Sequence, residues 1–497
     1  MRLHHGIIFL EFSQLQSTTA ICPSLFNATT AQDGILSRIR LPAGLITATQ
    51  CEALLKVVNQ FGNGEIQITN RANLQIRTHQ ALSEEVLLDL QDYGLASSNP
   101  SIDGLRNIMA SPTAGIDMQA KINTIPLVKQ WNLYLVNHPE LAILSSKFSV
   151  CFDGGEMVNV SDRPNDIVFS ALEVSGEIYF SLYLSFGDRG ESPSPVGVLI
   201  APHQVMEVLA AFADIYREYT DLATNFTEER CNQQYSRLRP LRLRELLKDW
   251  GVERFLSAAT KRLGYSLQFI PLELMARETE TQQCDRYRHL GINPQKQRGL
   301  SYIGVVVPLG RLTATQLQGL ALLTTKYGGG ALRLTPWQNI LLTDIADVDI
   351  ERVTQELAHL GLSISVNHPY AAIAACSGYK GCKAAFTDTQ ADAKKVAAHL
   401  ESCIKLDYPI NIHFSGCDKS CAQHHSSDIA LVGIPIENGE TNSEMYRVYV
   451  GDDGDHFGKE LYAEYAAKDL PMLIEQLLRD YQSQRCNSTQ TFKEFVK

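Results

Sequence analysis

The sequence has no long hydrophobic run and no excess of positive charge. Its longest apolar stretches, such as residues 302–310 (YIGVVVPLG), are far shorter than the roughly 20 residues that cross a bilayer as a helix. The 44 Lys and Arg residues are outnumbered by 55 Asp and Glu, which gives a formal net charge of -11. A helical membrane span is therefore not expected. General nucleic-acid binding is disfavoured because a surface that follows phosphates needs a basic excess.

Cysteine is too sparse for a disulfide scaffold. There are 11 cysteines, an odd number, in 497 residues, and a chain of this length can bury large cores in two to four domains without cross-links. The first residues contain two histidines and only a short apolar run before Glu11, which is unlike a secretory signal. We therefore expect a cytoplasmic protein with reduced thiols.

The chain contains an internal repeat. Residues 42–77 align without a gap with residues 308–343, an offset of 266, and 11 of the 36 aligned positions are identical, including the sequence TATQ. Such self-similarity indicates a tandem duplication of one unit.

Each copy has the pattern of a β-α-β-β-α unit. In the first copy, LSRIRL predicts a strand, and apolar residues at Leu54, Leu55, Val58 and Phe61 then predict a helix. EIQIT and NLQIR predict neighbouring strands, and SEEVLLDLQDYGL predicts a second helix. This order is a ferredoxin-like half unit. It leaves a sheet edge exposed, so we expect the two copies to pack on one another.

Four arginines lie close together in the segment between the copies, at Arg237, Arg239, Arg242 and Arg244. One interpretation is a solvated connector helix, which is what a run of charge usually indicates. The other is that some of these cations face a polyanionic ligand.

Four cysteines form two pairs. Cys376 and Cys382 have C-x5-C spacing, and Cys417 and Cys421 follow after 34 intervening residues with C-x3-C spacing. Four thiolates on two short loops can each bind one iron of a [4Fe-4S] cluster, whose positive charge stabilises the deprotonated sulfur.

A structural zinc site or a pair of disulfides would also use four cysteines. Zinc takes four thiolates, but its ligand pairs are usually separated by about two to four residues. Disulfides are disfavoured in a reducing compartment. The seven remaining cysteines are better interpreted as buried, unreactive thiols: Cys22, Cys51, Cys151, Cys231, Cys284, Cys403 and Cys486.

The cysteine pairs and their surroundings resemble the superfamily of sirohaem-containing sulfite and nitrite reductases and their relative precorrin-3B synthase. The second pair lies in SGC...SCAQH...DIALVG. In the first copy, residues 69–77 resemble the family's Thr-x-Arg-x-x-x-Gln strand, residues 103–112 its Arg-Asn...Pro loop and residues 145–155 its Lys-Phe strand. The connector sequence LKDWGVERF is also similar, and the resemblance runs from about residue 33 to about residue 480.

The resemblance implies a mixed α/β (α+β) fold. It would contain a tandem duplication of ferredoxin-like half domains together with domains of the [4Fe-4S] and sirohaem type. The expected order is an N-terminal extension at 1–32, half domain 1 at 33–100, a tetrapyrrole-binding domain at 101–235, connector helices at 236–290, half domain 2 at 291–365, a [4Fe-4S] cluster domain at 366–485 and a C-terminal tail at 486–497.

The resemblance also implies a ligand with several carboxylates, which need cationic partners when they are buried. At the 266 offset Arg71 is replaced by Trp337, so we expect the first copy to supply the cations and the second the cluster. The candidate tetrapyrrole-binding residues are Arg71, Arg77, Arg106 and Lys147, with Asn73 and Gln75 as neutral hydrogen-bonding partners.

Two segments differ from the reductase pattern. Residues 144–149 read LSSKFS where reductases have Leu-Pro-Arg-Lys-Phe/Trp-Lys/Asn, and residues 417–421 read CDKSC where reductases usually have Cys-Pro-Asn-x-Cys. Losing cations from a site that must hold an oxyanion is costly, since electrostatic stabilisation is its main resource. Residues 22–46 also resemble the opening of precorrin-3B synthases.

We therefore expect a precorrin-3B synthase-like oxidoreductase of cobalamin biosynthesis, which would use oxygen to hydroxylate precorrin-3A and form a lactone. The alternative is a ferredoxin-dependent nitrite or sulfite reductase with sirohaem and a [4Fe-4S] cluster. A third interpretation is a non-catalytic protein that binds a tetrapyrrole or a cluster.

The resemblance implies the following cofactors and partners. Cys376, Cys382, Cys417 and Cys421 would hold a [4Fe-4S] cluster. Oxygen chemistry would need a mononuclear non-haem iron, for which, or for proton delivery, His424 and His425 are candidates. Sirohaem is expected if the reductase alternative holds. The expected partners are a tetrapyrrole substrate and an electron donor, either ferredoxin or a reduced nicotinamide system, with no nucleic acid and no membrane.

Overall fold

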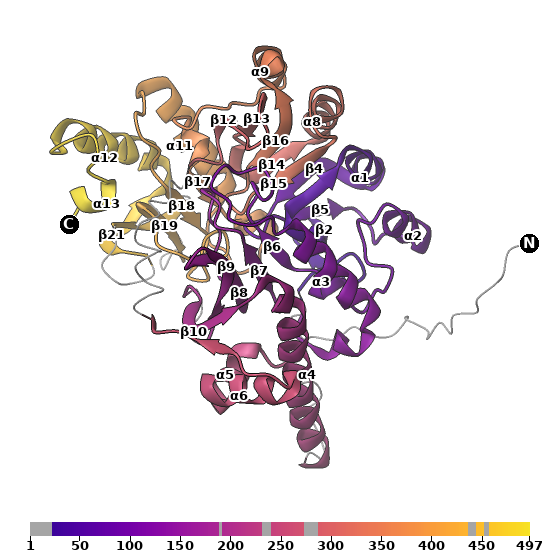
Figure 1. The fold of residues 1–497 in the computed structure, drawn as a ribbon. Coiled ribbons are helices and arrows are strands. Elements are labelled where there is room, and N and C mark those ends of the chain that lie inside the picture. Colours follow the sequence, from indigo (N-terminus) through magenta and orange to yellow (C-terminus); the bar gives the residue numbers. More distant parts are fainter. Residues whose placement is uncertain (1–21, 188–190, 231–239, 273–286, 436–443, 452–456) are drawn as a thin grey trace, which may run out of the picture.

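The computed structural model describes residues 22–187, 191–230, 240–272, 287–435, 444–451 and 457–497, and it contains two pairs of related sheets (Figure 1). Arg237 and Arg239, and likewise Cys231 and Cys284, lie outside the described residues. The two smaller sheets, with 24 strand residues each, belong to the repeated units. The two larger sheets, with 32 and 27 strand residues, follow them in the chain and carry the functional loops.

The two smaller sheets are antiparallel, and each contains one strand from the other copy. The first has the order β1-β2-β5-β4-β14 and the second β12-β13-β16-β15-β3. The strands of the first sheet are β1 (Thr29–Ala31), β2 (Gly34–Ile39), β5 (Leu74–Thr78), β4 (Gly62–Ile68) and β14 (Arg311–Thr313). Those of the second are β12 (Gly291–Pro294), β13 (Leu300–Val305), β16 (Ile340–Ala346), β15 (Ala331–Leu334) and β3 (Leu45–Thr47).

The exchange of β3 and β14 joins the copies. β3 pairs with β15 in the second sheet, and β14, its equivalent in the repeat, pairs with β4 in the first. Each exchanged strand covers an edge that its partner unit would otherwise expose to other chains. The expectation that the copies pack on one another is confirmed.

The repeated TATQ sequence starts the equivalent helices α1 (Ala48–Phe61) and α8 (Ala314–Tyr327). In each, the threonine oxygen accepts from the backbone N–H of the glutamine, whose side chain accepts from the threonine N–H. These reciprocal bonds satisfy two donors at the helix start. The two helices lie side by side (Figure 1), and one apolar core contains residues of both copies. The outer helices are α2 (Glu84–Asp92) and α9 (Ile350–His359).

The two larger sheets share a topology. The first has the order β11-β10-β9-β8-β7-β6 and the second β17-β18-β19-β20-β21. Each contains three neighbouring parallel strands followed by antiparallel ones. The strands of the first are β6 (Ile108–Ala110), β7 (Val150–Asp153), β8 (Ile167–Val174), β9 (Glu177–Leu184), β10 (Ser194–Ile200) and β11 (Gln268–Phe269); those of the second are β17 (Ile373–Ala375), β18 (Ile412–Ser415), β19 (Ile429–Ile434), β20 (Met445–Val450) and β21 (Lys459–Ala466).

Helices pack against each larger sheet. The first sheet is accompanied by α3 (Ile125–Asn137), α4 (Val205–Arg230), α5 (Leu243–Trp250) and α6 (Val252–Leu263), and the last three lie together at one end of the molecule (Figure 1). The second is accompanied by α10 (Gly378–Gly381), α11 (Thr389–Cys403), α12 (Leu470–Gln484) and α13 (Phe492–Phe495). Each group has its own apolar core. We call these parts the first and second large modules.

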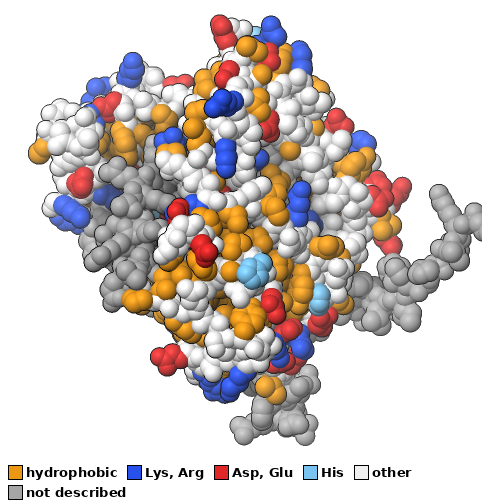
Figure 2. Space-filling model, in the orientation of Figure 1, with side chains coloured by type: hydrophobic (Ala, Val, Ile, Leu, Met, Phe, Trp, Pro, Cys, Tyr) orange, Lys and Arg blue, Asp and Glu red, His pale blue; other side chains and the backbone are white. Residues whose placement is uncertain are grey.

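The surface carries charges of both signs. On the face shown in Figure 2, Lys and Arg side chains are interspersed with Asp and Glu, and apolar side chains gather near its centre. Among the described residues, no helix is both long enough and apolar enough to span a bilayer.

The close approach of Gly44 to β15 predicts a position-specific stability effect. Gly44 has φ 67°, and a β-carbon there would lie 2.6 Å from the Leu334 carbonyl oxygen. Gly64 has φ 78° but no heavy atom within 4 Å of its β-carbon position. Both alanine variants incur left-handed strain of about 1–2 kcal/mol, but only Gly44→Ala also displaces a strand. Differential scanning calorimetry should show a lower melting temperature for Gly44→Ala than for Gly64→Ala, and equal values would contradict the close approach.

Candidate functional site

A cavity of about 460 Å³ lies between the two large modules and the end of the first small sheet. Its wall includes seven cationic side chains and two carboxylates, those of Asp166 and Glu191. We call it the cationic cavity. Its cations are Arg38, Arg40, Arg71, Lys147, Arg163, Arg242 and Arg244.

Several of these cations are buried without sufficient counter-charge. Burial lowers the pKa of Arg40 to about 10, and the neighbouring Arg38 cation contributes to the shift. Burial also lowers the pKa of Arg71 to about 10. The Nε atoms of Arg38, Arg40 and Arg242 are buried and have no hydrogen-bond partner within the part of the chain that is described. Burying an unpaired charge is costly, so this wall is suited to a ligand that carries several negative charges.

Arg71 and Arg242 are held by one loop of the first large module. Arg71 donates to the Pro164 carbonyl and, at 2.6 Å, to Asn165 Oδ1. Arg242 lies 3.2 Å from Asp166 Oδ1. The other oxygen of Asp166 accepts from the Ser149 backbone and hydroxyl at 3.0 and 3.1 Å. The Asp166 carboxylate therefore binds both Arg242 and Ser149 in this wall.

The first and third of the four candidate cysteines lie at one edge of the second large sheet. Cys376 directly follows β17 and Cys417 lies just beyond β18, its parallel neighbour. The Gly416 N–H donates to the Cys376 sulfur at 3.2 Å. A β-carbon at Gly416 would lie 2.5 Å from that of Ala385. Glycine at this position therefore permits the close approach of the two cysteine loops.

Cys382 and Cys421 complete the candidate group from the same loops. Cys382 follows α10 and Cys421 lines the cationic cavity. Both are exposed, whereas Cys376 and Cys417 are partly exposed. Sulfurs around one tetrahedral zinc ion lie about 4 Å apart, since each Zn–S bond is about 2.3 Å. In the described chain no three of these cysteines approach within 4.8 Å of one another. A [4Fe-4S] cluster, by contrast, gives each sulfur its own iron.

The expectation that the remaining cysteines are buried is confirmed only in part. Cys51 and Cys151 are buried, and burial raises the pKa of Cys51 to about 12. It is wrong for Cys486, which is exposed, and for Cys22 and Cys403, which are partly exposed. Cys22 also lines the cationic cavity. The sequence could not separate these positions because the exposure of a cysteine depends on what packs over it.

Two side chains connect the first copy to the cysteine loops. Asn70 Nδ2 donates to the carbonyl oxygens of Cys421 and Ala422 at 3.3 and 3.2 Å. Arg77 donates to Ser377 Oγ at 3.1 Å and pairs with Asp33. Arg77 therefore lies beside the cysteine loop and outside the lining of the cationic cavity.

Three more of the expected tetrapyrrole-binding residues lie outside the cavity lining. The Asn73 side chain is buried and accepts from the Leu41 N–H at 2.8 Å. Gln75 is half-buried on β5, opposite Arg38 in the sheet. Arg106 pairs with Asp103 and donates to Asn132 at 3.1 Å. The structure therefore gives these three side chains partners outside the cavity lining or leaves them out of it. Lys147, by contrast, is exposed at the wall.

His424 and His425 both line the cavity. Arg163 lies 3.4 Å from His425 Nε2, and its guanidinium lies over the Trp337 ring, 5.3 Å from the ring centre. Trp337 stacks in turn on His289, with 4.5 Å between the ring centres. Trp337, which is equivalent to Arg71 in the repeat, therefore also lines the cavity, where it contributes an aromatic ring.

Sequence reasoning missed Arg38, Arg40 and Arg163. The first two lie two residues apart in the segment LSRIRL, and residues with that spacing in a strand point to the same face. That alternation was the available signal. No comparable sequence signal marks Arg163, because only the fold brings its loop to the cavity. Arg242 and Arg244 both line the cavity, which agrees with the interpretation that cations of the connector face a polyanionic ligand.

Family models match most of the chain outside the cysteine loops. The Nitrite/Sulfite reductase ferredoxin-like half domain matches residues 30–91 and 293–360. The Nitrite and sulphite reductase 4Fe-4S domain matches residues 101–267. All four candidate cysteines lie beyond these matches.

Relatives cover nearly the whole chain. Ferredoxin–nitrite reductase of Synechococcus elongatus is 30% identical over 458 residues, which is 89% of this chain and 85% of that protein. The chloroplastic ferredoxin–nitrite reductase of Zea mays is 30% identical over 89% of this chain and 78% of its own. Sulfite reductase [ferredoxin] 2 of Mycolicibacterium paratuberculosis is 29% identical over 90% and 79%.

A solved structure with the same fold is that of NirA. The Mycobacterium tuberculosis NirA protein superimposes with a TM-score of 0.74 at 24% sequence identity, over 93% of this chain and 83% of that one. The expected mixed α/β fold with duplicated half domains is therefore confirmed.

The unpaired burial of Arg40 predicts opposite effects on stability and on ligand binding. Its side chain is 2% exposed and makes one long bond, 3.4 Å, to the Ser146 carbonyl. Arg40→Met should raise the melting temperature of the ligand-free protein, because it removes a desolvated charge, and should weaken binding of an anionic tetrapyrrole. Calorimetry and absorbance titration measure the two effects, with exposed Arg352→Met as the control. A variant that is destabilised and binds normally would contradict this assignment.

Proposed function

The chain belongs to the nitrite and sulfite reductase family, is an oxidoreductase, and, we propose, reduces nitrite to ammonium with electrons from ferredoxin. The observation that carries this proposal is that the cationic cavity and Cys421 share one wall. A polyanionic redox cofactor in the cavity would then lie directly beside a candidate cluster ligand.

The expected precorrin-3B synthase activity is wrong. Relatives that are 28–30% identical over most of the chain are ferredoxin–nitrite reductases. The synthase interpretation relied in part on cations missing from residues 144–149. The lining of the cavity contains arginines from other segments, among them Arg40 and Arg163. The synthase activity was the reason to expect a role in cobalamin biosynthesis, a tetrapyrrole substrate and a separate non-haem iron. These expectations lose their support with it.

Membership of the family implies a [4Fe-4S] cluster and sirohaem. The sequence led us to expect the cluster, and to expect sirohaem under the reductase alternative. We assign the cluster to Cys376, Cys382, Cys417 and Cys421, and the acidic groups of sirohaem to the cationic cavity. The buried Nε atoms of Arg38, Arg40 and Arg242, which have no hydrogen-bond partner in the described part of the chain, fit a polyanion. When bound, sirohaem would supply the iron at which the oxyanion is reduced, and the cluster would supply its electrons.

The remaining side chains of the cavity hold the substrate and supply protons. Lys147, exposed at the wall, provides a mobile ammonium that attracts a small anion. His424 and His425 are suited to proton transfer because an imidazole titrates near neutral pH, and reduction of nitrite to ammonium consumes eight protons. The proximity of Arg163 to His425 restrains that ring.

The neutral, hydrogen-bonded side chain of Ser149 favours nitrite over sulfite as the substrate. Ser149 stands where reductases carry a second lysine or an asparagine, and its hydroxyl donates to Asp166 at 3.1 Å. It therefore adds no positive charge and has no free donor directed at a substrate. A singly charged nitrite needs less compensation than doubly charged sulfite.

The proposal predicts a substrate preference. Anaerobically purified protein should show the absorbance of both sirohaem and a cluster. With reduced ferredoxin it should convert nitrite to ammonium, with kcat/KM for nitrite at least about tenfold above that for sulfite, a difference of about 1.4 kcal/mol. Ammonium and sulfide assays measure the two products. Protein with both chromophores that reduces only sulfite would refute the preference, and protein that reduces neither would refute the function.

The cysteine assignment predicts a selective loss of iron. Each of Cys376→Ser, Cys382→Ser, Cys417→Ser and Cys421→Ser should lower iron and acid-labile sulfide and abolish nitrite reduction, because a serine hydroxyl replaces a thiolate ligand. Exposed Cys486→Ser is the matched control and should retain both. Elemental analysis and electron paramagnetic resonance check this. Full iron content in any of the four variants would remove that cysteine from the cluster.

A further inference from the structure

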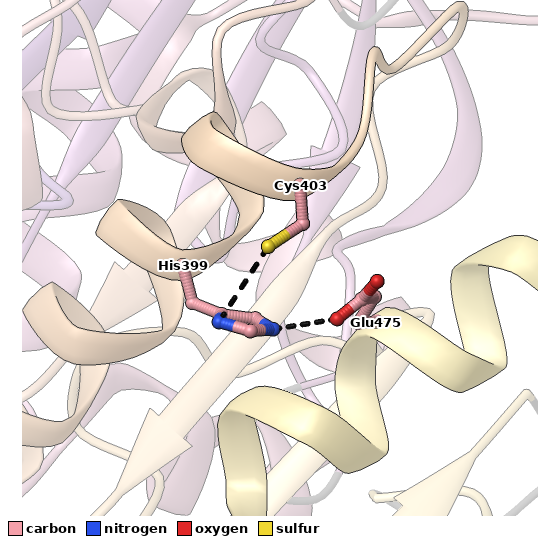
Figure 3. Close-up of side chains that lie close together, drawn as sticks. All are labelled: His399, Cys403 and Glu475. Atoms are coloured by element: carbon pink, nitrogen blue, oxygen red, sulfur yellow. Dashed lines mark hydrogen bonds and ion pairs between the residues drawn. The ribbon is translucent and has the colours of Figure 1, made fainter.

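A second group of potential metal ligands lies in the second large module (Figure 3). None of its members lines the cationic cavity. His399 and Cys403 are four residues apart in the last turn of α11, and Glu475 reaches them from α12. His399 Nε2 lies 2.6 Å from Glu475 Oε2, and the Cys403 sulfur lies 3.7 Å from His399 Nδ1. One donor atom of each residue lies within 4.8 Å of one donor atom of both others.

Arg479 holds two of the three residues in place. Arg479 donates through Nε to Glu475 Oε1 and through Nη2 to the Cys403 carbonyl, each at 2.7 Å. Hydrogen bonds from Arg479 and His399 hold the pKa of Glu475 below its usual range, so the carboxylate is charged at neutral pH. Such second-layer contacts orient ligands and are typical of metal sites.

The group is accessible to solvent. All three residues are partly exposed. Cys403 also lines an open cavity of about 490 Å³, together with His368 and Glu401. An ion can therefore enter without local unfolding, and a position for water is available beside the sulfur.

A thiol, an imidazole and a carboxylate in contact could form either an activated thiol nucleophile or a metal site. The position of Cys403 at the end of the helix distinguishes these two chemistries. As a free thiolate activated by His399, Cys403 would place a negative charge at the C-terminus of α11, where the helix dipole is also negative. A bound divalent cation is favoured at that end of a helix. With a thiolate, a carboxylate and a neutral imidazole, its complex has no net charge.

We propose that His399, Cys403 and Glu475 bind one Zn²⁺ ion, with water as the fourth ligand. A sulfur, nitrogen and oxygen donor set matches the preferences of zinc, which takes three protein ligands and one water at open sites. Cys403 and Glu475 contact different ring nitrogens of His399, so the ion would take one of these nitrogens. It would displace the hydrogen bond between His399 and Glu475, and Arg479 would continue to orient the carboxylate. The thiol proton is released to solvent on binding.

Zinc at this point would join α11 to α12. The first residue of α11, Thr389, donates to the Cys376 carbonyl at 2.8 Å. The same helix therefore carries a candidate cluster loop at one end and the proposed zinc ligands at the other. An ion that fixes its C-terminus restrains the support of that loop.

The test uses the full-length holoprotein, purified anaerobically and washed with a mild chelator. Zn²⁺ titration against a chromogenic chelator, with elemental analysis, should show one zinc per chain. X-ray absorption at the zinc edge should show one sulfur at about 2.3 Å with nitrogen and oxygen at about 2.0–2.2 Å. His399→Gln, Cys403→Ser and Glu475→Gln should each weaken zinc binding at least about tenfold and leave the iron content unchanged.

Matched controls separate this site from unrelated thiols and imidazoles. His359→Gln, in the last turn of α9 with its side chain 79% exposed, and Cys486→Ser should bind zinc as the parent does. The proposal is overturned if the three ligand variants retain parental affinity, or if the absorption spectrum shows four sulfurs, which would indicate zinc in the cluster cysteines. It is also overturned if no zinc binds and Cys403 is alkylated faster than Cys486 only when His399 is present, the behaviour of a thiol nucleophile.

Discussion

The burial of positive charge without matching carboxylates is the constraint on which the functional centre depends. Seven cations and two carboxylates line the cationic cavity, and the pKa values of Arg40 and Arg71 are lowered by burial. A buried cation without a partner destabilises the fold, and a bound group that supplies negative charge removes this cost. The family's anionic tetrapyrrole meets that requirement, and the cavity would hold it beside Cys421.

The exchange of β3 and β14 explains how the cavity wall is assembled. Each strand completes the sheet of the other copy, so neither half unit is complete alone and the shared core fixes their relative orientation. Arg71 and Trp337, equivalent in the repeat, consequently line the same cavity. The duplication thus gave two copies of one position different chemistry, one cationic and one aromatic.

The two large modules show a similar division of roles. Both place loops at the carboxyl ends of neighbouring parallel strands, but the four candidate cysteines all belong to the second. In that module α11 extends from the cysteine loops to the group formed by His399, Cys403 and Glu475. The proposed cluster and the proposed zinc ion therefore share one rigid helix, with different donor sets at its two ends.

The sequence by itself determined the duplication, the capped helices and the strands, because these depend on local patterns such as TATQ and alternating apolar residues. It also marked the four candidate cysteines through their spacing. Only the tertiary structure decided which cations face the cavity: Arg38, Arg40 and Arg163 do, whereas Arg77 and Arg106 have other partners. It likewise brought Glu475 to Cys403 across 71 intervening residues. The physical reason is that spacing fixes the contacts of residues within one element, while the side chains of distant segments meet only where the packed core places them.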